Sequence, residues 1–422
     1  MPELQERYAA AVESQEARPA ESISAFRDII LSSTKANDAE SVKVKEQSIQ
    51  KLADLYASKE DAQALKTLLV ELRPLFDVIP KAKTAKIVRA IIEAIAKVPD
   101  STLLQVEVCK EQVEWAKAEK RTFLRQRIEA RLANLYLGAK DFQAALALIG
   151  RLLTEVKRLD DKLLLVDVHL LETRAHHALK NLPKAKAALT AARTAANSIY
   201  VPPAVQADID MQSGTLHAEE RDYKTAYSYF FEAFEALSAL DDKRAVLALK
   251  YMLLAKIMAQ GEADEVPAII NSKAGVKYAG PEVDALRAVA NAHKDRSLAA
   301  FEAALTAHNE QLVQDRVVYA HIAALYDRLL EGNLARLVEP FSRVEIAHVA
   351  ELIQLPLQTV QTKLSQMILD KKFAGTLDQG AGCLEVFDDP VPDAVYPATL
   401  DTFESMSGVV DTLFARSQKV MA

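Results

Sequence analysis

The chain of 422 residues is half apolar, and its 59 acidic and 52 basic side chains give a net charge of −7. This composition is typical of a folded protein rather than a disordered one, and the overall charge does not indicate nucleic-acid binding. Only 11 Gly and 15 Pro interrupt runs of Ala, Leu, Lys, Glu and Gln, which argues against a β-sandwich or a β-barrel and favours helices.

Signals for membrane insertion or export are absent from the sequence. No apolar run approaches the roughly 20 residues that a membrane span requires, and the segment from Met1 to Arg7 lacks the apolar core of a signal peptide. Cys109 and Cys383 are too far apart in sequence to suggest a disulfide framework, so we interpret both as buried small apolar residues. We therefore expect a soluble protein that is not secreted.

A repeat of about forty residues organises the first part of the chain. Spacings of 40, 39, 41, 40, 41 and 40 separate seven polar turn residues, each followed by a segment rich in Ala and Leu: Glu21, Asp61, Asp100, Asp141, Asn181, Asp222 and Glu262. The segments Tyr56–Leu65 and Tyr136–Ala145 lie in register across eighty residues. We expect each unit to be a helix, a short turn and a second helix, which the Asp, Asn or Glu caps.

Such a helix pair cannot bury its own apolar face, so successive pairs must stack. The period exceeds the 34 residues of a tetratricopeptide repeat and reaches the range of HEAT repeats. The sequence therefore predicts an all-α fold that begins with a right-handed superhelical solenoid of tetratricopeptide-like helix pairs over residues 1–290. Surfaces of this kind favour protein interaction over a purely architectural spacer.

A different module follows the repeats. The next polar turn residue before an Ala- and Leu-rich segment, Asp295, comes 33 residues after Glu262, so the spacing of about forty residues ends there. We expect residues 291–341 to be helical and residues 342–389 to form a winged helix. Its predicted elements are a helix capped by Ser342, a second helix, two short strands and a hairpin loop: Arg343–Leu352, about Pro356–Asp370, Phe373–Leu377, Cys383–Phe387 and Asp378–Gly382.

A winged helix suggests DNA binding, because its second helix is able to enter a major groove. The charges oppose this function, since residues 342–389 hold four basic and seven acidic side chains and Gln358–Lys363 contains no arginine. Protein contact is favoured instead. We expect the hairpin, with Phe373 and Val386 as candidate residues, to pair with a strand edge of a neighbouring subunit.

The C-terminal segment, residues 393–422, is predicted to be an assembly helix. After Pro390, Pro392 and Pro397 interrupt the chain, apolar residues recur at spacings of 3, 3, 4 and 3 and line one narrow seam: Leu400, Phe403, Met406, Val410 and Leu413. We expect this seam to join a bundle of several subunits. The alternative is that it packs on the winged helix of its own chain.

The charge distribution is uneven along the chain. Residues 81–131 carry twelve basic and seven acidic side chains, whereas residues 377–422 carry two and eight. Lys117, Lys120, Arg121 and Arg125, followed by Arg127 and Arg131, are candidates to meet an acidic surface of a partner. The alternative is a solvated face or internal pairing with neighbouring Glu residues.

No motif for catalysis or cofactor binding stands out. The sequence holds no Walker A loop, dinucleotide fingerprint, nucleophile elbow or paired-cysteine metal motif. His169, Glu172, His176 and His177 are the nearest to a metal site, but they lack the histidine pair of a zinc protease and are interpreted as residues between helices. We expect no catalytic, cofactor-binding or metal-binding residues, no small-molecule substrate and no enzyme activity.

Several stretches carry a family likeness. Together with the solenoid, three of them resemble the PCI family, which is named for subunits of the proteasome lid, the signalosome and an initiation factor: Leu325–Leu334, Glu339–Val344 and Leu364–Phe373. Three more resemble the proteasome lid branch of that family: Glu114–Gln126, Asn181–Ala188 and Leu249–Leu254. The likeness covers the chain from Val44 onward.

The resemblance implies a non-catalytic scaffold in ubiquitin-dependent protein degradation, in the cytoplasm and nucleus. Its implied partners are other PCI subunits of the lid, the lid deubiquitinase subunit, an ATPase subunit of the base and an α-ring subunit of the core particle, with no nucleic acid and no membrane. The alternatives are a PCI scaffold of the signalosome or of a translation initiation factor complex, and a winged-helix nucleic-acid binder.

Overall fold

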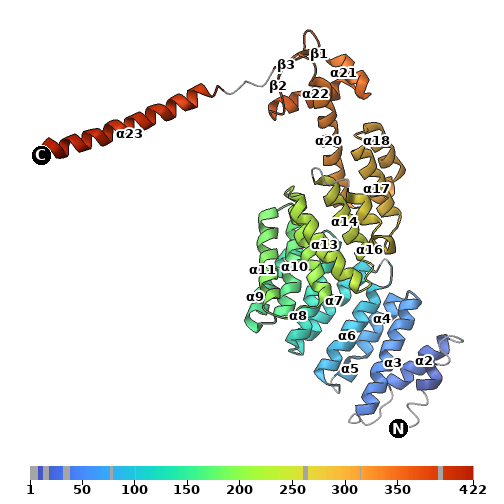
Figure 1. Ribbon diagram of the computed structural model, residues 1–422. Coiled ribbons are helices and arrows are strands. Elements are labelled where there is room, and N and C mark those ends of the chain that lie inside the picture. The colour runs from blue at the N-terminus through green and yellow to red at the C-terminus, as the bar shows by residue number, and fades with distance from the viewer. Residues whose placement is uncertain are drawn as a thin grey trace. The chain divides into compact units, whose positions relative to one another are not determined.

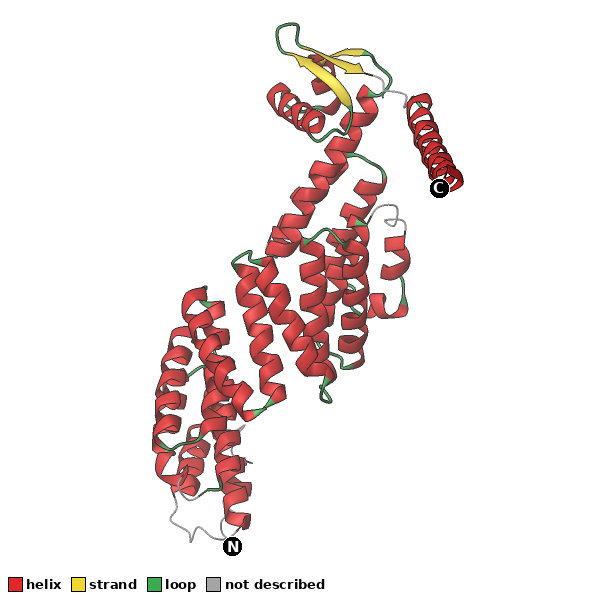
Figure 2. Cartoon of the chain, turned by 90° about the vertical axis from the view of Figure 1, so that its left-hand side faces the viewer, coloured by secondary structure: helices red, strands yellow, loops and turns green. Residues whose placement is uncertain are grey.

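A computed structural model describes residues 8–12, 19–31, 39–76, 79–99, 101–259, 265–313, 315–387 and 393–421. These residues are almost entirely helical, with three short strands (Figures 1 and 2). The chain divides into two compact units. The N-terminal unit comprises residues 1–259 and 271–278, and the C-terminal unit comprises residues 260–270 and 279–422. The predicted domain limits at residues 290, 341 and 389 stay predictions.

The N-terminal unit is built from successive antiparallel helices. They are α2 (Pro19–Leu31), α3 (Ala39–Ser58), α4 (Ala62–Glu71), α5 (Arg73–Phe76), α6 (Lys81–Ala96), α7 (Thr102–Ala118), α8 (Thr122–Gly138), α9 (Phe142–Leu159), α10 (Lys162–Ala178), α11 (Leu182–Asn197), α12 (Pro203–Glu219), α13 (Tyr223–Ala239), α14 (Ala245–Met258) and α16 (Lys273–Lys277).

The predicted turn residues cap helices at four places. Asp61, Asp141, Asn181 and Asp222 accept hydrogen bonds from the backbone N–H groups of the first turns of α4, α9, α11 and α13. The residue before each cap has a positive φ, which ends the preceding helix. Glu21 is a correction, because it lies within α2 rather than at a turn. The predicted turn residues Asp100 and Glu262 lie outside the described residues.

Each helix from α7 to α14 packs on the next, and α8, α10 and α12 also contact one another in order (Figure 1). Small and branched side chains are fully buried where α10, α11 and α12 meet, among them Val166, Ala185, Ala192 and Ile209. The small alanine side chains let the helix axes approach closely. Each helix pair covers the apolar face that its neighbour cannot bury alone. The predicted all-α solenoid is confirmed.

Aromatic residues fill the junction of α12, α13 and α14. Phe230 is buried and meets the ring of Tyr251 edge-on, with ring centroids 5.4 Å apart. Gly214 faces the same ring, since a Cβ atom at this position would lie 2.6 Å from Cε1 of Phe230. The absence of a side chain at Gly214 therefore sets how closely α12 and α13 approach.

The C-terminal unit begins with α15 (Val266–Ile270) and continues with α17 (Pro281–Lys294), α18 (Leu298–Ala307), α19 (Asn309–Val313) and the long α20 (Arg316–Val338). The winged helix follows, formed by β1 (Arg343–Glu345), α21 (Ile346–Ile353), α22 (Leu357–Leu369), β2 (Ala374–Asp378) and β3 (Cys383–Phe387). The last helix is α23 (Val395–Met421). The predicted winged-helix module and C-terminal helix are both confirmed.

The sheet of the winged helix is antiparallel, in the order β1-β3-β2. The prediction of a helix capped by Ser342 is wrong, because Arg343–Glu345 pairs with β3 and α21 begins only at Ile346. Val344 is buried opposite Leu384 while its two neighbours are exposed, an alternation that favours a strand. The predicted second helix is confirmed, and the first hairpin strand lies one residue later than predicted.

A group of charged side chains fastens α20 to the winged helix. Lys363 of α22 pairs with Asp327 and Glu331 of α20 at 3.3 and 3.1 Å, and Lys372 also binds Glu331. Burial raises the pKa of Glu331, but the hydrogen bonds from Lys372 and Lys363 prevail, so its pKa lies below the ordinary value of 4.5. Ionised Glu331 therefore stabilises the folded state above that value.

We expect Gly214→Ala and Gly150→Ala to change stability in opposite directions. A Cβ atom at Gly150 meets nothing within 4 Å, so alanine should stabilise α9 by about 0.5–1 kcal/mol. At Gly214 the clash with Phe230 should cost roughly 1–3 kcal/mol, which exceeds the gain in helix propensity. Urea unfolding of the two variants beside the parent chain measures the difference. Stabilisation by both substitutions would contradict the close approach of α12 and α13.

We expect Glu331→Gln to destabilise the winged helix by roughly 1.5–3 kcal/mol at pH 7, because two charge-assisted hydrogen bonds are weakened. The difference should shrink as the pH falls through the lowered pKa of Glu331, where the parent chain also loses this charge. Hydrogen exchange of α22 and β3 at pH 7 and below pH 4 measures it. The exposed Glu351→Gln serves as the control, and an equal effect from the control would contradict the prediction.

Candidate interaction surfaces

Two of the predicted basic residues serve the fold. Arg121 donates a hydrogen bond to the carbonyl oxygen of Phe76 at 3.1 Å, and its guanidinium lies 4.9 Å from the ring centroid of Trp115. Arg125 is only 16% exposed; it hydrogen-bonds Glu155 and pairs with Glu129 at 3.8 Å. Internal pairing with Glu residues thus describes Arg125, whereas Arg121 contacts a carbonyl oxygen and a Trp ring. The interaction role of both stays a prediction.

Other basic residues of the same stretch face solvent. Lys117 is exposed near the end of α7, and Lys120 is exposed in the turn between α7 and α8, with a φ of 54°. Lys120 lines a surface pocket of about 470 Å³ together with Lys81 of α6 and Phe123, whose side chain is 61% exposed. An exposed aromatic ring in a pocket that two lysines also line suits an acidic partner that offers an apolar side chain.

The hairpin does not present the edge that the sequence predicted at Val386. β3 is the central strand, and the backbone N–H of Val386 donates to the carbonyl oxygen of Ser342 at 2.9 Å. Phe373 is half-buried against the core of the winged helix. The edges of this sheet are β1 and β2, so a neighbouring strand has to pair with one of these. The third strand was missed because three residues give too short an alternation to recognise.

The second helix of the winged helix has little to offer a nucleic acid. Lys363 is the only basic residue of α22, and its charge is engaged by Asp327 and Glu331 of the same chain. An ammonium group held by two carboxylates has little left for a phosphate. This geometry agrees with the preference for protein contact.

The apolar seam of the C-terminal helix is exposed along its whole length, and α23 contains no buried side chain among its described residues. The five predicted seam residues, Leu400, Phe403, Met406, Val410 and Leu413, are 58–69% exposed. Tyr396, Val409 and Phe414 are also exposed, so at about 100° per residue the apolar stripe covers about half of the helix circumference. The apolar stripe is therefore wider than the narrow seam that the sequence predicted.

The position of Pro397 is a second correction. This residue does not precede the helix, because it lies in the first turn, where proline is tolerated.

The polar residues that came nearest to a metal site make contacts within α10 and with α12. Nδ1 of His169 lies 2.9 Å from Glu172, and Nε2 of His177 lies 3.5 Å from Glu219 of α12. In the described part of the chain, no group of three or more His, Cys, Asp and Glu side chains is placed to hold a metal ion.

None of the described helices is long and apolar enough to cross a membrane.

Comparison with protein families gives three matches, in chain order. The 26S proteasome regulatory subunit RPN6 N-terminal domain matches residues 4–139, the PCI domain matches residues 305–388, and the 26S proteasome subunit RPN6 C-terminal helix domain matches residues 392–418. Both ends of the chain and its winged-helix region are therefore covered by family descriptions.

Curated relatives are similar over nearly the whole chain. The 26S proteasome non-ATPase regulatory subunit 11 homolog of Arabidopsis thaliana is 62% identical over 387 residues, which cover 92% of each chain. The 26S proteasome non-ATPase regulatory subunit 11 of Dictyostelium discoideum is 49% identical and covers 89% of this chain and 91% of the relative. The 26S proteasome regulatory subunit RPN6 of Saccharomyces cerevisiae is 45% identical, with 88% and 87% covered.

We expect Arg121→Ala to destabilise the N-terminal unit and Lys120→Ala to leave it nearly unchanged. The first substitution removes a charge-assisted hydrogen bond and the contact with Trp115, together worth roughly 1.5–3 kcal/mol. The second removes an exposed side chain, which usually changes stability by less than about 0.5 kcal/mol. Urea unfolding of both variants measures this, and equal losses would show that Arg121 has no special structural role.

Proposed function

The chain belongs to the family of 26S proteasome regulatory subunits that includes the RPN6 and non-ATPase regulatory subunit 11 proteins, and we propose that it is a non-catalytic scaffold subunit of the proteasome lid. The observation that carries this proposal is the order of the matches, because an RPN6 N-terminal domain, a PCI domain and an RPN6 C-terminal helix occur in one chain. In this role the chain joins other subunits during ubiquitin-dependent protein degradation.

Three separate surfaces support a scaffold role. The N-terminal unit exposes Lys81, Lys120 and Phe123 in one pocket, the winged helix has two strand edges, and α23 exposes a broad apolar stripe. Each kind of surface suits a different mode of protein contact: a charged rim, strand pairing and helix packing. A chain that holds several neighbours at once needs such separate surfaces.

We assign the partners to these surfaces as follows. The edges β1 and β2 pair with the sheets of other PCI subunits, and α23 packs in a helical bundle with lid subunits, including the deubiquitinase subunit. The N-terminal unit contacts an ATPase subunit of the base and an α-ring subunit of the core particle. The proposed locations are the cytoplasm and the nucleus, and the chemistry of degradation belongs to the partners.

The similarity of the reported relatives, each described as a proteasome subunit, favours the proteasome over the signalosome or an initiation factor complex. Affinity purification of the tagged chain from cells, followed by identification of the associated proteins, separates these assemblies. Recovery with base ATPase and core-particle subunits supports the proposal. Recovery with signalosome or initiation factor subunits alone would overturn it.

We expect Phe403→Asp combined with Leu413→Asp to block incorporation into the lid. Both side chains lie on the apolar stripe, where each buried side chain contributes about 1.5–3 kcal/mol, and a buried carboxylate opposes association further. Recovery of the tagged chain in assembled particles measures incorporation. The stability of the rest of the chain should hardly change, because α23 has no buried side chain among its described residues.

Ser405→Asp combined with Thr412→Asp is the matched control, because it adds the same charge outside the apolar stripe of α23, about 160–180° around the helix from Phe403 and about 80–100° from Leu413. The control should assemble like the parent chain. Normal assembly of the Phe403 and Leu413 variant would refute the bundle, and a large fall in its melting temperature would favour docking of α23 within the chain.

A further inference from the structure

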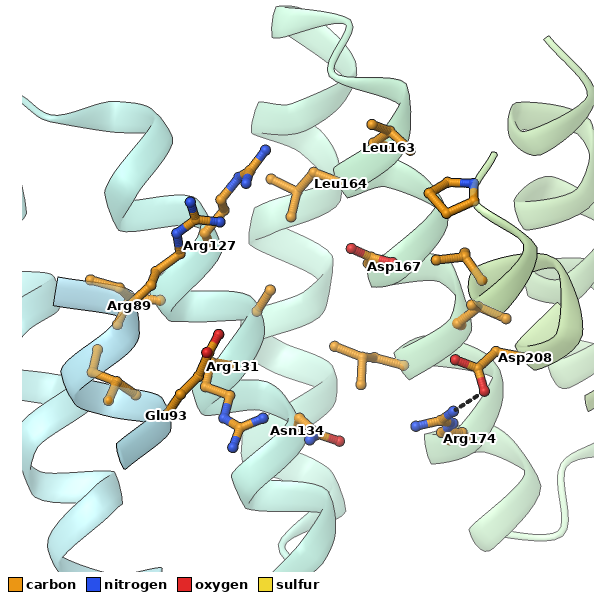
Figure 3. A pocket seen from close by; sticks show the side chains of 17 residues that line it. Arg89, Glu93, Arg127, Arg131, Asn134, Leu163, Leu164, Asp167, Arg174 and Asp208 are labelled. Atoms are coloured by element: carbon orange, nitrogen blue, oxygen red, sulfur yellow. Dashed lines mark ion pairs between the residues drawn. The ribbon is translucent and has the colours of Figure 1, made fainter. Parts of the chain in front are cut away.

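A pocket in the N-terminal unit, which we call the arginine groove, lies across four alternate helices, α6, α8, α10 and α12 (Figure 3). It has a volume of about 620 Å³ and is open to solvent, and all of its lining residues belong to this one unit. The volume lies within the range of ligand-binding clefts, about 300–1,000 Å³. Arg127 and Arg131 belong to the basic stretch that the sequence predicted to meet an acidic surface, but no partner has been assigned above to the groove itself.

One wall of the arginine groove carries three arginines without ionic partners. Arg89 of α6 and Arg127 of α8 are exposed and line the groove, and Arg131 lies one turn further along α8 (Figure 3). Within the described residues, none of the three forms an ion pair with a carboxylate, and Nε of Arg131 is buried with no hydrogen-bond partner. Positive charges that line one pocket repel one another, so a bound anion would stabilise the group.

The acidic residues of the groove offset this charge only in part. Burial raises the pKa of the Asp167 carboxyl on α10, against the opposing effect of the Arg127 charge. Asp208 of α12 is already engaged by Arg244 at 2.8 Å and by Arg174 at 3.9 Å. The lining holds four arginines against three carboxylates, the other two being Glu93 and Asp167. The groove therefore keeps an excess of positive charge on the side of α6 and α8.

The remaining lining suits a peptide better than a free inorganic anion. Leu163 of α10 is 43% exposed, and Val205 of α12, which also lines the groove, is half-buried, so the floor offers apolar surface. Asn134 of α8 also lines the groove, and an amide side chain both donates to and accepts from a peptide backbone. A phosphate ion would pair with the arginines and leave the apolar side chains of the floor exposed to solvent.

We propose that the arginine groove binds an extended acidic segment of another protein. Carboxylates of the segment pair with Arg89, Arg127 and Arg131, and an apolar side chain between them packs on Leu163 and Val205. Packed helix axes lie about 9 Å apart, so the two intervals from α8 through α10 to α12 span about 18 Å, and α6, which packs on α8 less closely, adds at least one interval more. At about 3.3 Å per residue this corresponds to roughly eight or more residues of extended chain.

This inference goes beyond the proposed scaffold function, because it concerns a surface of the isolated chain and needs no assembled lid. The test uses the full chain and a fluorescein-labelled nine-residue peptide of alternating Glu and Leu, with binding followed by fluorescence anisotropy at low salt. We expect saturable binding that weakens as salt is added. The corresponding peptide of alternating Lys and Leu should not bind.

Arg89→Glu combined with Arg127→Glu should weaken binding of the Glu-Leu peptide at least tenfold. The matched control is Lys140→Glu combined with Lys180→Glu, which makes the same change of net charge at exposed turn positions outside the groove. Glu60 already occupies an equivalent turn with a φ of 57°, so glutamate is accepted there. The control should bind within about twofold of the parent chain, since surface charges far from a site act weakly.

Three outcomes would overturn the proposal. The first is no binding of the Glu-Leu peptide by the parent chain, and the second is an equal loss of binding in both double variants, which would indicate general attraction by net charge. The third is that sodium tripolyphosphate displaces the peptide while Leu163→Asp leaves peptide affinity unchanged. In that case the groove is a site for small polyanions and has no apolar contact with a peptide.

Discussion

Burial of the apolar face between successive helix pairs is the constraint on which the other features of the N-terminal unit depend. Ala185, Ala192 and Ile209 have no solvent exposure, although each helix pair alone would leave them wet. This burial requires helices of nearly equal length, which end where a residue of positive φ is followed by a cap. Helix packing does not constrain the side chains that point away from the shared faces. The candidate interaction surfaces of this unit are formed by such side chains.

Charged residues fall into two groups according to whether a partner lies within the chain. Arg121, Arg125 and Lys363 are held by carbonyl or carboxylate groups and are mostly screened from solvent, so they fix neighbouring helices in place. Arg89 and Arg127 form no ion pair among the described residues, although the charge of Arg127 acts on Asp167, and both line a groove. The cost of bringing unpaired charges together is tolerated where a partner can relieve it, which separates surfaces that serve binding from those that serve folding.

Regular features were predictable from sequence, and features that depend on distant contacts were not. The forty-residue spacing placed the caps at Asp61, Asp141, Asn181 and Asp222, because a cap is a local hydrogen bond and its residue type is restricted. The order of the strands was not predictable, since β1 becomes a strand only by pairing with β3, about forty residues later in the chain. Sequence also grouped Arg121 with Lys120 as candidate interaction residues. Their different roles become clear only from the contacts of Arg121 with Phe76 and Trp115.

The exposed apolar stripe of α23 also bears on the fate of chains that have not found their partners. Soluble monomers rarely expose contiguous apolar patches of more than a few hundred Å², and an amphipathic helix with half of its circumference apolar is a strong site for self-association. An unassembled copy is therefore more prone to aggregate, and a better substrate for chaperones, than one whose helix is covered. In the proposed assembly, synthesis of this chain has to stay in proportion to that of the proteins that cover α23, because every surplus copy leaves the apolar stripe exposed.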